Sequence, residues 1–142
     1  MNTLPFEKAK ALKDAGFPQP EFSFGQRWYD DSFSGPELCV FTRVDALGRK
    51  CFSYPSFNTS ADYGDCSGFV YIPTEGELLA AIFLLSYSHS YTADMDTCNI
   101  SFEDGSYNAH SISNTNPLEC LADAYLILRN VYQTKTSKEA DV

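Results

Sequence analysis

Lysine and arginine are missing from residues 51–128, a stretch of 78 residues that holds ten aspartates and glutamates. This stretch therefore supplies the chain's net charge of −9. Proteins contact nucleic-acid phosphates and anionic lipids through Lys and Arg. The composition thus argues against direct nucleic-acid binding and against membrane binding. It favours attraction to a basic protein surface, and solubility alone is the other explanation of the charge.

Closely spaced cysteine pairs are also missing. The five cysteines are odd in number, lie far apart and include no Cys-x-x-Cys motif. A disulfide framework or a zinc site needs closer, paired spacing. We expect most of the cysteines to be buried thiols, and we expect no metal and no cofactor. The cysteines are Cys39, Cys51, Cys66, Cys98 and Cys120.

No long hydrophobic run is present. The longest, Leu78–Leu85, has eight residues, whereas a membrane-spanning helix needs about 20. Residues 1–17 contain charged side chains where a signal peptide has an apolar run. We therefore expect a cytoplasmic protein.

Catalytic motifs are scarce, and only two histidines occur. His89 lies among serines in residues 86–92, which we expect to be a polar loop after a helix. His110 lies in a segment with strand character. The chain has no Gly-x-Ser-x-Gly, His-Glu-x-x-His or Gly-x-Gly-x-x-Gly motif. We expect no enzymatic activity; a hydrolase that uses His89 or His110 is the less favoured alternative.

Helix signals occur at three places. Residues 5–15 begin with proline, continue with helix-forming residues and are followed by glycine. A second helix should begin after Thr74, because Thr74 and Glu77 form a Thr-x-x-Glu capping box, and its many apolar residues predict that it is mostly buried. A third should begin at Asn116, an N-cap followed by proline.

Strand signals are more numerous. Residues 37–44 and 50–54 are rich in β-branched and aromatic residues, and the turn between them predicts a hairpin. Residues 98–112 predict a second hairpin, with a type I′ turn at the Asp-Gly pair that begins with Asp104. Residues 55–68 are polar, and we expect them to form a long loop.

The order of these elements predicts an α+β fold, because adjacent strands are joined by short turns and the helices are separate from them. We expect a single domain over residues 1–133, with a mainly antiparallel sheet packed by about three helices, N-terminal, central and C-terminal. Residues 134–142 are expected to form a disordered tail.

Aromatic residues make up 15% of the chain, which is compatible with an aromatic core or with a stacking surface. Aromatic rings can stack on a nucleotide base, and arginines can bind its phosphate. The candidate cations Arg27, Arg43, Arg49 and Lys50 all precede residue 51, so such a pocket would have to use the N-terminal part of the chain. Its candidate residues are Arg27, Trp28, Tyr29 and Arg43.

Four segments resemble small accessory proteins of bacteriophages and prophages. They are Gly16–Gln19, Trp28-Tyr29, Pro73–Leu78 and the Ala/Leu-rich helix Pro117–Leu128. The resemblance covers about half of the chain and involves turns and helix caps. It implies expression in the cytoplasm of a bacterial host, and an activity that consists of occupying a host protein or a nucleotide signal.

We therefore predict a non-enzymatic accessory protein that binds and blocks a host protein, such as a defence protein, through an acidic, aromatic-rich surface. The alternative is a sponge that sequesters a small or cyclic nucleotide. Association with a second copy is compatible with either. The residues assigned to the acidic surface are Asp94, Asp96, Glu103 and Asp104.

Overall fold

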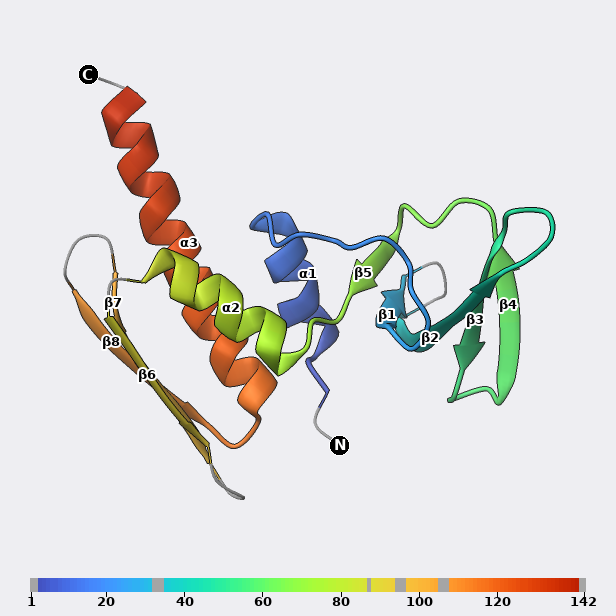
Figure 1. The fold of residues 1–142 in the computed structure, drawn as a ribbon, viewed down its shortest axis with the longest axis horizontal. Coiled ribbons are helices and arrows are strands. Elements are labelled where there is room, and N and C mark those ends of the chain that lie inside the picture. Colours follow the sequence, from blue (N-terminus) through green and yellow to red (C-terminus); the bar gives the residue numbers. More distant parts are fainter. Residues whose placement is uncertain (1–2, 32–34, 87, 94–96, 105–107, 141–142) are drawn as a thin grey trace. The chain divides into compact units, whose positions relative to one another are not determined.

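The computed structural model describes residues 3–31, 35–86, 88–93, 97–104 and 108–140, with the backbone alone over residues 132–140. The fold is α+β, as the sequence predicts, with three helices and two antiparallel sheets (Figure 1). The chain forms two compact units. The sheet unit comprises Phe17–Ile72, and the helical unit comprises Met1–Gly16 with Pro73–Val142.

The sheet unit consists of five antiparallel strands in the order β4-β3-β2-β1-β5. The predicted hairpin is confirmed as β2 paired with β3. The strands are β1 (Arg27–Asp30), β2 (Glu37–Val44), β3 (Lys50–Tyr54), β4 (Thr59–Tyr63) and β5 (Phe69–Tyr71).

Strand β4 lies inside residues 55–68, where the sequence predicts only a loop. Its five residues pair in continuous register with β3, from Tyr54 opposite Thr59 to Lys50 opposite Tyr63. Ser and Asp have low strand propensity, but pairing with a neighbouring strand overrides such local preferences. Because Ala61 and Tyr63 also pack against the core, the loop prediction is wrong for this segment.

One face of the five-stranded sheet carries an aromatic core. Phe52 is fully buried, and its ring centroid lies 4.5 Å from that of Phe69. The half-buried Phe22 covers this cluster, with its ring 4.4 Å from Trp28. The high aromatic content of the sequence is therefore used largely for packing. The buried members are Trp28, Cys39, Phe41, Phe52, Tyr54, Phe69 and Tyr71.

The helical unit contains three helices and a sheet with the strand order β6-β7-β8. Helix α3 packs against α1, α2, β7 and β8 (Figure 1). The elements are α1 (Phe6–Asp14), α2 (Glu75–Leu85), β6 (Ser88–Ala93), β7 (Cys98–Glu103), β8 (Ala109–Asn114) and α3 (Pro117–Ala140). No helix among the described residues is both long and apolar enough to cross a membrane.

Local caps begin two of the helices as predicted. At α2, the Thr74 side chain accepts from the Glu77 N–H (3.2 Å), and Glu77 Oε1 accepts from the Thr74 N–H (3.0 Å). At α3, Asn116 Oδ1 accepts from the N–H of Leu118 (3.0 Å). These bonds satisfy backbone donors that the helix itself leaves unpaired.

Three local predictions differ from the structure. Residues 88–93 form strand β6 instead of a loop, because they pair along the whole of β7. The second hairpin exists, but Glu103 pairs with Ala109, so its connection is longer than the predicted two-residue turn at Asp104. Helix α3 continues through residues 134–140, assigned above to a disordered tail, because extending a formed helix adds one hydrogen bond per residue.

Candidate functional site

An ion-pair cluster lies at the turn of the β2–β3 hairpin. Asp45 Oδ1 accepts from the backbone N–H groups of Leu47 and Arg49, both at 2.9 Å. Asp45 Oδ2 accepts from Nε of Arg49, also at 2.9 Å. The Arg49 backbone bond is the main cause that holds the pKa of Asp45 below its ordinary value. The carboxylate therefore closes the turn and orients the arginine.

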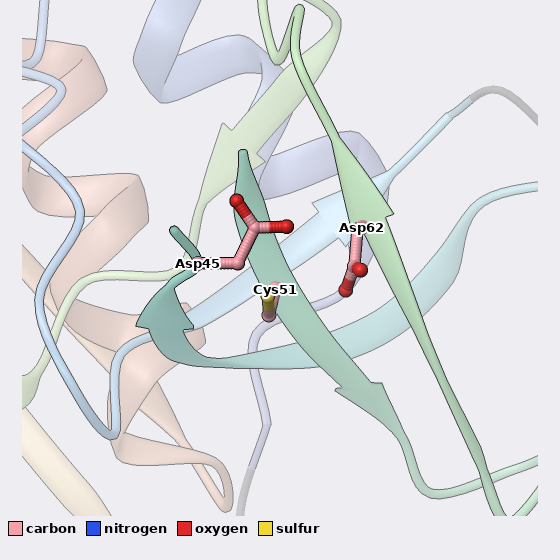
Figure 2. A group of neighbouring side chains, drawn as sticks. All are labelled: Asp45, Cys51 and Asp62. Atoms are coloured by element: carbon pink, nitrogen blue, oxygen red, sulfur yellow. The ribbon is translucent and has the colours of Figure 1, made fainter. Parts of the chain in front are cut away.

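Cys51 and Asp62 complete this cluster. They are register partners on β3 and β4, so their side chains share one face of the sheet (Figure 2). Their ligand atoms and one carboxylate oxygen of Asp45 all lie within 4.8 Å of one another. A hydrogen bond to Asp62, followed by burial, raises the pKa of the Cys51 thiol.

Two carboxylates and a thiol are ligands of the kind that zinc accepts. The guanidinium of Arg49, however, lies against both carboxylates, with Nη2 3.9 Å from Asp62 Oδ2. A metal would have to displace this cation and remove a proton from Cys51. The geometry is that of a charge-compensated cluster that stabilises the hairpin. The sequence does not reveal this cluster, because Asp62 meets Cys51 only through the pairing of β4 with β3.

A second polar cluster lies inside the aromatic core. The carboxylate of Asp30 is fully buried, and Oδ2 accepts a 2.5 Å hydrogen bond from the hydroxyl of Tyr54. The Tyr54 and Tyr63 hydroxyls are 3.1 Å apart. Burial, followed by the charge of Asp30, raises the pKa of the neighbouring Cys39 to about 12. A buried carboxylate is tolerated in an apolar core when hydrogen bonds compensate for its lost hydration.

The four residues of the predicted nucleotide pocket are divided between the two faces of the sheet. Trp28 is 3% exposed in the aromatic core, and its Nε1 donates to Gln26 Oε1 at 3.2 Å. Arg27 and Tyr29 alternate with Trp28 along β1 and therefore point to the other face. Arg43 pairs with Cys51 on that same face. The prediction that Trp28 stacks on a ligand is wrong, because core packing covers its ring.

The four residues of the predicted acidic surface do not form an exposed acidic cluster among the described residues. Asp94 and Asp96 lie outside the described residues. Glu103 is half-buried at the end of β7. Asp104 is only 1% exposed; it accepts from the Asn108 N–H (3.1 Å), and its Oδ2 lies 2.7 Å from Nε2 of His110. Asp104 therefore supports the hairpin connection and does not offer an exposed carboxylate.

The two histidines lie in one cross-strand row, on either side of Phe102. His89 Nδ1 is 3.3 Å from the hydroxyl of Ser86, whereas His110 is paired with Asp104. A Ser-His-Asp triad needs a serine and an aspartate at the same histidine, but here the serine lies at His89 and the aspartate at His110. This geometry therefore does not favour the hydrolase alternative.

Helix α2 exposes part of its apolar surface. Leu78 and Ile82 are fully buried, but Leu84 is 86% exposed and Phe83 is 43% exposed. The Phe83 ring stacks on His89 of β6, with centroids 3.8 Å apart. The sequence predicts a mostly buried helix because nearly all of its residues are apolar. That prediction is wrong, because Leu78 and Ile82 are the only buried residues among the 11 of α2.

No protein-family model, no curated protein and no solved structure matches this chain. The resemblance to phage accessory proteins therefore remains a prediction.

Proposed function

We propose that this chain is a non-enzymatic accessory protein, of the kind that phages produce, which binds and blocks a host protein. The observation that carries the proposal is the exposed apolar surface at the end of α2. Its exposed residues are Phe83 and Leu84, and they lie within residues 51–128, which contain acidic residues and no Lys or Arg. Exposed apolar residues bordered by polar ones are typical of protein-binding surfaces.

The apolar residues would supply binding free energy. Covering a side chain the size of Leu or Phe contributes on the order of 1.5–3 kcal/mol. A few such residues commonly dominate an interface. Phe83 is also held by its stack on His89, which lowers the entropy lost on binding.

The charges would select the partner. Glu75 and Glu77 are exposed in the first turn of the same helix. Opposite charges on a partner increase the association rate, and like charges oppose association. A chain with a net charge of −9 therefore favours a basic protein surface over a second copy of itself.

The test compares two exposed leucines. Leu84→Ser changes the α2 surface, and Leu47→Ser changes a leucine that is 77% exposed in the sheet unit. Each variant and the wild type is immobilised and exposed to a bacterial lysate. A protein that wild type and Leu47→Ser retain is then purified, and its Kd is measured at low and moderate salt.

We expect Leu84→Ser to weaken binding at least tenfold and Leu47→Ser to leave the Kd unchanged. Glu77→Gln, which can still form the helix cap, should weaken binding mainly at low salt. The proposal is wrong if Leu84→Ser and Leu47→Ser retain the same proteins with the same Kd, or if the wild type retains nothing that Leu84→Ser loses.

A further inference from the structure

Strand β6 is an edge strand, hydrogen-bonded within its sheet to β7 alone. All six of its residues pair with β7 in unbroken register, from Ser88 opposite Glu103 to Ala93 opposite Cys98. Five of the six are exposed, and Tyr91 is half-buried. The backbone N–H and C=O groups on the far side of such a strand can pair with another chain.

Proteins normally protect edge strands with charge, proline, a bulge or short length. The sheet unit follows this rule, because β4 carries Asp62 at its edge and β5 is only three residues long. Strand β6, with the sequence Ser-His-Ser-Tyr-Thr-Ala, has no Asp, Glu, Lys or Arg, no proline and no bulge. Its edge is therefore suited to accepting a strand.

The two sides of β6 differ in chemistry. His89 and Tyr91 alternate with Ser90 and point to the inner side of the sheet, where Phe83 of α2 stacks on His89. Ser88, Ser90 and Thr92 point outward. Across the sheet, this outer face continues as a grid of small polar side chains, formed by Asn99, Ser101, Ser111 and Ser113.

The opposite edge strand, β8, also lacks Asp, Glu, Lys, Arg and proline, but its surroundings differ from those of β6. Helix α3 packs against β8 and β7 and covers their inner side. Residues of β8 alternate between exposed and half-buried, whereas β6 is exposed along nearly its whole length. A strand added at β6 would therefore lie next to Phe83, which stacks on His89, whereas β8 packs against α3.

We propose that the partner binds by adding an extended segment to the free edge of β6, with apolar side chains toward α2 and basic side chains toward the outer face. This inference rests on the proposed function and names its mode of recognition. Main-chain hydrogen bonds supply affinity in such complexes, and alternate side chains supply specificity. The basic residues are argued from the charge of residues 51–128, and the apolar residues from the exposed Phe83, which stacks on His89 of β6.

The sheet offers a matched pair of positions for the test. Ser90 on β6 and Ser111 on β8 are both exposed, both point outward and both pair with Ser101. Ser90→Lys and Ser111→Lys therefore make the same change of charge at opposite edges of the sheet. The probe is a fluorescent octapeptide of alternating Lys and Val, and fluorescence anisotropy gives its Kd for each full-length variant.

We expect Ser90→Lys to weaken peptide binding at least tenfold and Ser111→Lys to have at most a twofold effect. In two further peptides, alternate backbone nitrogens are methylated, at odd or at even positions. One of them should lose binding and the other should retain it, because an added strand uses alternate N–H groups. A peptide with Glu in place of Lys should not bind.

Four results would each overturn strand addition at β6. They are equal effects of the two lysine substitutions, a larger effect at Ser111, no binding of the Lys-Val peptide, and equal binding of both methylated peptides. None of these results decides the proposed function. That function is decided separately by the comparison of Leu84→Ser with Leu47→Ser against the purified host protein.

Discussion

The hydroxyl of Tyr54 on β3 donates a 2.5 Å hydrogen bond to the fully buried carboxylate of Asp30 on β1. The two residues are 24 positions apart, and β2 lies between their strands. The bond places a polar pair within an otherwise aromatic core. It also ties together strands that are not direct neighbours.

Tyr54→Phe should lower the free energy of unfolding by about 1–3 kcal/mol, because it removes a hydrogen-bond donor from the buried acceptor Asp30. Urea denaturation, monitored by fluorescence, measures this change in the free energy of unfolding. An unchanged midpoint would show that Asp30 does not depend on the hydroxyl of Tyr54.

Tyr91→Phe should change the free energy of unfolding in the opposite direction from Tyr54→Phe. The hydroxyl of Tyr91 is buried, and no described residue forms a hydrogen bond of normal length and angle with it. Burial, followed by the charge of Glu75, raises its pKa to about 12. Removing an unsatisfied buried hydroxyl should raise the free energy of unfolding by up to about 1 kcal/mol. A loss of stability as large as that expected for Tyr54→Phe would contradict this view of the site.

Alkaline pH should destabilise the protein through Cys39. The unfolded chain ionises this thiol near its ordinary pKa of 9.0, whereas the folded chain keeps the proton until about pH 12. Between these values the unfolded state binds fewer protons, so stability falls as the pH rises. Urea midpoints from pH 8 to 11 should fall less steeply in Cys39→Ala than in the wild type. Equal slopes would exclude Cys39 as a cause.

Thiol reactivity should single out Cys66. It is the one cysteine that is not buried, since the other four are between 0 and 4% exposed. In the native protein, a disulfide-exchange reagent should modify Cys66 first, and the others should react at the rate of unfolding. Mass spectrometry of the partly labelled protein identifies the site. Early labelling of Cys98 or Cys120 would contradict their burial.

The Asp45–Cys51–Asp62 cluster should bind a soft cation only after Arg49 is removed. In Arg49→Ala, the two carboxylates lose the cation that lies against them. The thiol sulfur of Cys51 and one oxygen of each carboxylate are then close enough to one another to bind a single metal ion. Cadmium should then give a thiolate charge-transfer band at neutral pH that is much weaker in the wild type. The double variant Arg49→Ala/Cys51→Ala is the control and should give no band. An equally strong band in the wild type would show that Arg49 does not block the site.

Local signals in the sequence were sufficient for the helix starts and for the first hairpin. Thr74 with Glu77, and Asn116 before Pro117, act within a few residues, so their effect can be read without the fold. Strand β4 could not be predicted in this way. Its residues are polar, and it exists because β3 offers a paired edge and the core offers space for Ala61 and Tyr63.

For the candidate sites, too, the sequence determines some properties and the tertiary structure determines others. The sequence by itself determined the charge: residues 51–128 contain no Lys or Arg, whatever the fold. Only the tertiary structure decided which groups are exposed. It buried Asp104 and Trp28 and left Leu84 at the surface. Exposure depends on which residues from distant segments cover a side chain, and hydrophobicity along the chain does not contain that information.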